Sequence, residues 1–190
     1  MTEAEWLGCG KPVLMVRALG EEASARKLQL FAVVVLQGPD GLYPEPETHL
    51  VMAERFADGL IGAADLRRSW GSGAEVPAVP ERAHEWAEWA AIGDTEEYGP
   101  RWAFDMMARF VREVFGNPFR PVAFATDWRT DTALALARQM YEACDFSAMP
   151  ILADALQDAG CDDSEILDHC RGDGPHVRGC WVVDLVLGKT

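Results

Sequence analysis

The sequence predicts a mainly α-helical protein, a compact multi-helix domain of roughly eight to ten helices joined by short loops. Three observations lead to this prediction: helix N-cap residues recur, apolar residues repeat at helical spacing after most of them, and glycine or proline ends most segments. Of the 190 residues, 49% are hydrophobic, which is enough for a sizeable core. We expect a single domain over residues 1–190; the alternative is two lobes, 1–70 and 81–190, joined by linker 71–80.

The helices expected in the first part of the chain cover about residues 3–9, 12–20, 24–36 and 48–60, and residues 63–70 are compatible with a further short helix. Thr2 and Glu5 form a capping box for the first helix, because each side chain can bond the backbone amide of the other. Segment 24–36 is ambiguous: it begins with helix-favouring residues, but the run from Phe31 to Val35 is compatible with a strand. We expect a helix there, because the segment is long and follows a capping serine. The segment from Gly38 to Glu47 holds too many prolines and glycines for regular structure.

The helices expected in the second part cover about residues 81–91, 101–116, 131–145, 149–160 and 165–171, followed by a final helix from Pro175 to about Gly188. Thr130 is the expected N-cap of the third of these helices. Asp162 is the expected N-cap of the fifth, with Glu165 as its capping-box partner. Gly160 is expected in the left-handed conformation that ends the helix before it. Residues 119–126 are expected to be extended.

Acidic residues outnumber basic ones, 31 against 17, which gives a net charge of −14. A chain of this charge repels phosphate backbones and anionic membrane surfaces, so we expect neither a direct nucleic-acid partner nor a membrane. The longest apolar run, Leu30 to Leu36, is far shorter than the ~20 residues of a membrane span. Residues 2–6 are acidic where a signal peptide is basic. We therefore expect a cytoplasmic protein whose five cysteines are reduced.

Candidate metal ligands and nucleophiles are concentrated near residues 160–180. Three of the five cysteines and two of the four histidines fall there: Cys161, His169, Cys170, His176 and Cys180. Thiolates and imidazoles are the side chains that proteins use to bind zinc and to carry out covalent catalysis. The group contains no Cys-x2-Cys pair, so the alternative is that the thiols simply fill the core.

A zinc site is one hypothesis for this group, with zinc as the only cofactor. In the final predicted helix, His176 and Cys180 lie four residues apart on one face and can bind one ion. The other half would come from Cys161 and from either His169 or Cys170, because adjacent residues of a helix point about 100° apart. The predicted ligand set is Cys161, Cys170, His176 and Cys180.

A thiol-dependent enzyme is the second chemical hypothesis. Cys180 would be the nucleophile, His176 its base, and Asp184 the group that orients the histidine. The expected position of Cys180, a turn or more inside a helix, weakens this hypothesis, because the helix dipole lowers a thiol pKa mainly at the helix start. The chain also lacks a glycine-rich phosphate loop and a Gly-x-Ser-x-Gly nucleophile motif.

Several segments resemble those of a large family of uncharacterised bacterial proteins. The most specific are FGNPFRPV, PILADALQDAGCDDSEILDHCR and HVRGCWVVDLVLGK, while TEAEWL, RKLQLFA and HLVMAERFADGL match more loosely. Members of that family often carry a cysteine-rich segment where this chain has Phe31 to Val35. The resemblance implies a mostly helical cytosolic protein, favours a helix over residues 24–36, and implies no activity.

The chain therefore has ample core but neither a cofactor loop nor a recognisable catalytic group. We expect first a non-enzymatic protein-interaction or regulatory module, which binds a protein partner or associates with itself. The alternatives are a zinc-stabilised helical protein and a thiol-dependent enzyme centred on Cys180 and His176.

Overall fold

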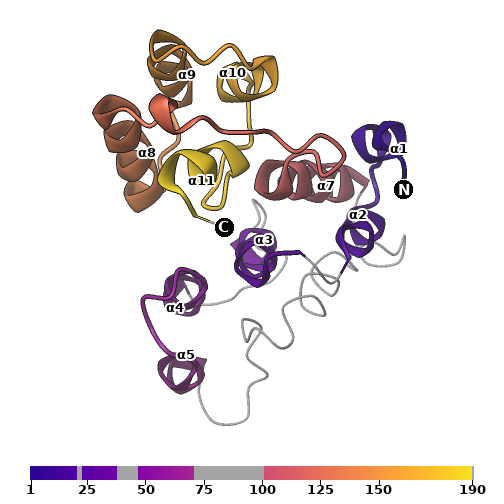
Figure 1. The fold of residues 1–190 in the computed structure, drawn as a ribbon. Coiled ribbons are helices and arrows are strands. Elements are labelled where there is room, and N and C mark those ends of the chain that lie inside the picture. Colours follow the sequence, from indigo (N-terminus) through magenta and orange to yellow (C-terminus); the bar gives the residue numbers. More distant parts are fainter. Residues whose placement is uncertain (21–22, 38–46, 71–100, 190) are drawn as a thin grey trace. The chain divides into compact units, whose positions relative to one another are not determined.

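The computed structural model describes residues 1–20, 23–37, 47–70 and 101–189. Within these ranges the protein forms ten α-helices, one short 3-10 helix and no β-strand (Figure 1). The prediction of a mainly α protein with eight to ten helices is therefore confirmed. Three predicted segments lie outside the described residues: the linker at 71–80, the helix at 81–91 and the irregular segment at 38–46.

The chain divides into two compact units, an N-terminal unit, Met1–Arg112, and a C-terminal unit, Glu113–Thr190. The boundary between them falls inside helix α7 (Arg101–Phe115). The last residues of this helix, from Glu113 onward, therefore belong to the C-terminal unit.

Five of the described helices of the N-terminal unit precede α7. They are α1 (Glu3–Gly8), α2 (Pro12–Leu19), α3 (Ala25–Gln37), α4 (Glu47–Ala57) and α5 (Ala63–Trp70). The predicted capping box is present at α1: the Thr2 hydroxyl accepts from the Glu5 amide at 3.3 Å, and the Glu5 carboxylate accepts from the Thr2 amide at 2.7 Å. Helix α4 packs against both α3 and α5.

The ambiguous segment 24–36 forms most of helix α3, as predicted. Every residue from Leu28 to Leu36 is buried, so this helix is covered on all sides rather than on one face. A helix in such surroundings needs apolar residues around its whole circumference, which explains the valine run without a strand. Among the described helices, neither α3 nor any other has the combination of length and apolar character that crossing a bilayer requires.

The C-terminal unit packs four helices around one core (Figure 1). They are α8 (Asp131–Ala143), α9 (Met149–Asp158), α10 (Ser164–Arg171) and α11 (Trp181–Leu187), preceded by the 3-10 helix η2 (Thr126–Trp128). Helix α8 packs against α9 and α11, and α9 packs against α10. Thr130 caps α8 as predicted, because its hydroxyl accepts from the Ala133 amide at 3.2 Å.

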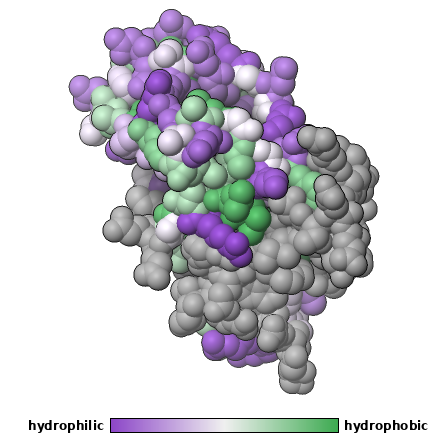
Figure 2. Space-filling model, turned by 90° about the vertical axis from the view of Figure 1, so that its right-hand side faces the viewer, coloured by the Kyte–Doolittle hydropathy of each residue, from purple (hydrophilic) through white to green (hydrophobic). Residues whose placement is uncertain are grey.

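The helices α9 and α10 separate apolar from charged residues. Leu152, Leu156 and Ile166 are fully buried in the core. Hydrophilic residues dominate the upper surface in Figure 2, where these two helices lie in Figure 1. The exposed charged residues of these two helices include Asp154, Asp158, Asp168 and Arg171. The amphipathic pattern of the sequence thus places each helix with its apolar side inward.

The N-cap of α10 is Asp163, so the prediction of Asp162 is wrong by one residue. The Asp163 carboxylate accepts from the amides of Glu165 at 2.9 Å and Ile166 at 3.2 Å, which satisfies the free amides at the helix start. The Glu165 carboxylate pairs with Arg120 at 3.5 Å instead of completing a capping box. In contrast, Gly160 has the predicted left-handed conformation, with φ of +89°.

The final helix starts at Trp181, and the predicted start at Pro175 is wrong. Gly179 has φ of +94°, far from the negative φ of a right-handed helix, so the helix cannot run through this residue. The Cys180 amide donates to the Val177 carbonyl at 2.9 Å in a turn before the helix. Cys180 is therefore the N-cap residue of α11 rather than a residue of its interior.

Candidate metal centre

Four side chains of the C-terminal unit converge on one point: Glu113, His169, His176 and Cys180. Each offers one ligand atom, and these atoms all lie within 4.8 Å of one another. The residues come from α7, α10, the loop after α10 and the N-cap of α11. Four separate segments therefore meet in this group, which we call the Glu113 cluster.

The ends of the helices bring these positions together. Glu113 lies in the last turn of α7, and His169 lies in the last turn of α10. The loop after α10 then reverses the chain and carries His176 to Glu113. Because α11 starts directly after Cys180, this thiol lies at the beginning of the helix and faces the same point.

The predicted arrangement of His176, Cys180 and Asp184 on one helix face is wrong, because His176 precedes the helix. His176 and Cys180 are nevertheless both members of the Glu113 cluster. Asp184 is buried one turn into α11, where its amide donates to the Cys180 carbonyl at 2.9 Å. Its side chain is not among the converging groups of the described residues.

The Glu113 carboxylate contacts both histidines. Its Oε1 lies 3.2 Å from Nδ1 of His176, and its Oε2 lies 3.4 Å from Nε2 of His169. The same nitrogen of His169 lies 3.2 Å from Sγ of Cys180. The two imidazole rings meet edge to face, with centroids 5.1 Å apart. Each side chain thus contacts at least one other member of the cluster.

The cluster is almost closed to solvent. The exposed fractions of the Glu113, His176 and His169 side chains are 3%, 10% and 17%, and Cys180 is fully buried. Charges and hydrogen bonds in such an environment interact more strongly than they do in water. The charges and hydrogen bonds of these side chains therefore act mainly on one another.

Burial alone would raise the pKa of Glu113, because a buried carboxylate loses its hydration. Hydrogen bonds from His169 and His176, followed by the electrostatic interaction of the carboxylate with the two rings, outweigh this effect and lower the pKa to about 2. Glu113 is therefore ionised at neutral pH and provides the negative charge of the cluster.

His176 faces an acceptor at each ring nitrogen. Its Nδ1 faces Oε1 of Glu113, and its Nε2 lies 3.4 Å from the Gly172 carbonyl oxygen. Burial lowers the pKa of His176, but the hydrogen bond and charge of Glu113 and the bond to Gly172 raise it above its ordinary value. A ring between two acceptors is suited to hold a proton on both nitrogens, so His176 and Glu113 form a buried ion pair.

The Cys180 thiol is unsuited to act as a nucleophile. Burial and the nearby charge of Glu113 raise its pKa well above the ordinary value, which keeps it protonated. The imidazole that contacts its sulfur is that of His169, whereas the enzyme hypothesis requires His176. This geometry argues against a thiol-dependent enzyme centred on Cys180 and His176.

Cys161 and Cys170 are buried in the same unit but do not belong to the Glu113 cluster. Burial raises the pKa of both thiols, to about 12 for Cys170. Cys170 is adjacent to His169 on α10, and only one of two adjacent helical side chains can face a given point. In this structure that side chain is His169.

The prediction from sequence omitted Glu113 and considered His169 only as an alternative to Cys170. A sequence signal for Glu113 exists: it lies three residues after Phe110 and next to Val114, both buried on the apolar face of α7. A charged residue at such a position needs a buried partner. The identity of that partner depends on the tertiary fold, because it comes from a distant segment.

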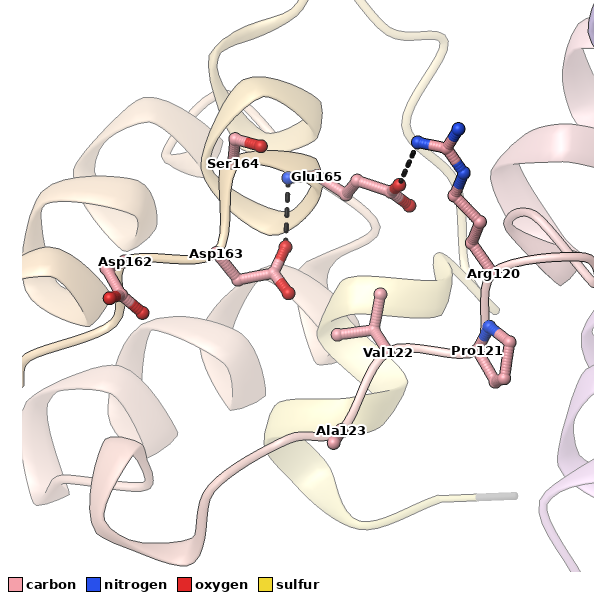
Figure 3. A pocket seen from close by; sticks show the side chains of 8 residues that line it. All are labelled: Arg120, Pro121, Val122, Ala123, Asp162, Asp163, Ser164 and Glu165. Carbon is pink, nitrogen blue, oxygen red and sulfur yellow. Dashed lines mark hydrogen bonds and ion pairs between the residues drawn. The ribbon is translucent and has the colours of Figure 1, made fainter.

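A pocket of about 370 Å³ lies at the N-terminus of α10 (Figure 3). Three of its four charged side chains have structural partners, as Figure 3 shows: Glu165 pairs with Arg120, and Asp163 accepts from the Glu165 amide. These groups stabilise the helix start and connect it to the preceding extended segment. The Glu113 cluster, with four convergent ligand atoms, is therefore the stronger candidate for a functional site.

No protein-family model, curated protein or solved structure matches this chain. Function is therefore inferred from the residues of the Glu113 cluster and from their geometry.

Proposed function

We propose that the C-terminal unit is a zinc-stabilised helical module. One zinc ion is bound by Glu113, His169, His176 and Cys180 and holds their four segments together. The ion is the one expected from the sequence, and His176 and Cys180 are two of its expected ligands. The proposal replaces Cys161 and Cys170 by Glu113 and His169.

The distances within the cluster support this proposal. Ligand atoms that bind zinc tetrahedrally at about 2.0–2.3 Å are about 3.3–3.8 Å apart. The three contacts within the cluster measure 3.2, 3.4 and 3.2 Å, and the widest separation stays within 4.8 Å. The largest separation exceeds the zinc range by about 1 Å, so zinc binding requires the cluster to contract slightly.

The chemistry of the ligand atoms favours zinc over the common alternatives. Two imidazole nitrogens, one carboxylate oxygen and the Cys180 sulfur, which loses its proton when it binds zinc, suit a borderline-soft ion. Calcium and magnesium prefer sites made of oxygen ligands. The second nitrogen of His176 also faces the Gly172 carbonyl, which is the usual way to orient a metal-binding histidine.

Four protein ligands leave no position of a tetrahedral ion for water or substrate, which is typical of structural zinc sites. The near-complete burial of the cluster agrees with such a role. The proposed ion therefore stabilises the fold and performs no reaction.

Metal analysis of the purified protein tests this proposal. Protein prepared without chelators, or given zinc and then desalted, should carry one zinc ion per chain. Cys180→Ala should lose this zinc, whereas Cys161→Ala and Cys170→Ala, which make the same change at the other two buried thiols, should retain it. The proposal fails if the wild-type protein carries no zinc, or if the two control variants lose zinc as Cys180→Ala does.

A protein-interaction or regulatory role, with a protein partner or self-association, stays a prediction from the sequence. It is compatible with a zinc-stabilised module, because such modules commonly serve as binding scaffolds. Light scattering after size-exclusion chromatography, with and without zinc, measures self-association directly.

A further inference from the structure

Trp181 contacts the proposed ligand His169 at the nitrogen that faces away from the cluster. The indole Nε1–H of Trp181 donates to Nδ1 of His169 at 3.1 Å, and the two ring centroids are 5.1 Å apart. The indole also lies against Gly116, where an added Cβ would be 3.2 Å from Cγ of Trp181. The ring is therefore held between His169 and the backbone that follows α7.

This hydrogen bond determines where the neutral His169 ring carries its hydrogen. A ring nitrogen that accepts a hydrogen bond has a free electron pair and no hydrogen. Since Nδ1 accepts from Trp181, the hydrogen is on Nε2, the nitrogen that contacts Glu113 and Cys180. Nε2 is also the nitrogen that the proposed zinc site uses.

Zinc binds a histidine only through a free electron pair, so zinc at Nε2 requires the hydrogen on Nδ1. That hydrogen would face the N–H of Trp181, and two donors 3.1 Å apart cannot form a bond. His176 has no such conflict, because its outer nitrogen faces the Gly172 carbonyl. Zinc binding therefore breaks a hydrogen bond at His169, whereas His176 keeps its bond to Gly172.

We infer that Trp181 regulates the zinc site: its hydrogen bond to His169 and zinc at Nε2 of His169 exclude one another. This inference rests on the proposed zinc site and adds a means of control to it. The bond stabilises only the zinc-free state, so by linkage it lowers the affinity for zinc. Zinc binding in turn releases the indole from Nδ1, so the position of Trp181 follows the occupancy of the site.

Zinc affinity in Trp181→Phe tests the inference, because phenylalanine keeps an aromatic ring on Gly116 but has no N–H. Trp128→Phe is the matched control, since Trp128 is also partly buried against the same core. Titration of zinc against a competing fluorescent indicator should give a Kd about two- to tenfold lower for Trp181→Phe than for the wild type, the effect of one hydrogen bond. Trp128→Phe should leave the Kd unchanged.

A second measurement uses the wild-type protein and does not depend on the folding of the variant. In the zinc-free protein, NMR should show a contact between one indole N–H and the His169 ring, and added zinc should abolish it. A contact that persists with zinc bound, or an equal Kd in a folded Trp181→Phe, overturns the inference while the zinc site stands. If the wild-type protein takes up no zinc, the zinc site itself fails and the inference fails with it.

Discussion

Glu113 and His176 form a buried ion pair that connects the end of α7 to the loop before α11. Oε1 of Glu113 lies 3.2 Å from Nδ1 of His176, and the two side chains are 3% and 10% exposed. A pair removed from water is screened little by salt, and the loss of one partner leaves the other charge buried alone. The pair therefore stabilises the closed arrangement of these segments even in zinc-free protein.

Glu113→Gln should destabilise the zinc-free protein by about 3 kcal/mol, because it leaves His176 without its counter-charge in the interior. The matched control is Glu165→Gln, which breaks the largely exposed pair with Arg120 and should cost less than about 1 kcal/mol. Urea unfolding in the presence of a chelator measures both changes. Similar losses in the two variants would contradict the assignment of a buried pair.

The zinc-free protein should be most stable in mildly acidic solution. The lowered pKa of Glu113 contributes stability that is present above its ordinary value of 4.5 and is lost as the pH falls toward about 2. The raised pKa of His176 contributes stability that is fully present below its ordinary value of 6.5 and is lost as the pH rises through the folded-state pKa. The free energy of unfolding should therefore peak between about pH 4.5 and 6.5, and Glu113→Gln should flatten both sides of this peak.

Gly116→Ala should destabilise the protein more than Gly160→Ala does. Both glycines have a positive φ, +67° and +89°, so alanine is strained at either position by about 1–2 kcal/mol. At Gly116 the added Cβ also lies 3.2 Å from Trp181, whereas at Gly160 it meets no atom within 4 Å. We expect an additional loss of about 1 kcal/mol at Gly116. Equal thermal midpoints for the two variants would show that Trp181 moves freely.

Thiol reagents should distinguish the exposed cysteine from the buried ones. Cys144 is exposed and should react rapidly in the folded protein, whereas Cys161, Cys170 and Cys180 should react only on unfolding. Cys9 is partly exposed and should react more slowly than Cys144, so Cys144→Ser should remove the most rapid phase and leave the others. Rapid modification of Cys180 at neutral pH would contradict the raised pKa of its thiol and revive the enzyme hypothesis.

Local signals predicted most helices well. The capping box of Thr2 and Glu5 and the N-cap at Thr130 require only neighbouring residues, and both are present. The valine run of α3 was ambiguous for a physical reason, because burial on all sides removes the periodicity that separates helix from strand. Most helices can therefore be predicted from local sequence, although hydrophobic periodicity alone does not assign segment 24–36.

The candidate site was harder to predict because its members meet only in the folded unit. Three of the four residues lie in the cysteine- and histidine-rich region that the sequence analysis selected. Glu113 lies far from them in sequence, and no local pattern identifies its partners. Because Gly179 has a positive φ, α11 starts at Trp181 and not at the predicted Pro175. Cys180 therefore lies at the helix start instead of inside the helix.

The long separation between Glu113 and Cys180 also orders events during synthesis. Glu113 is synthesised before α8, α9 and α10, so its carboxylate has none of its partners until His169, His176 and Cys180 follow. A chain that stops between α9 and α10 therefore carries the Glu113 carboxylate at the end of α7 without the two histidines that contact it in the folded unit. The C-terminal unit therefore cannot bury this carboxylate among its partners until the chain has been made through Cys180.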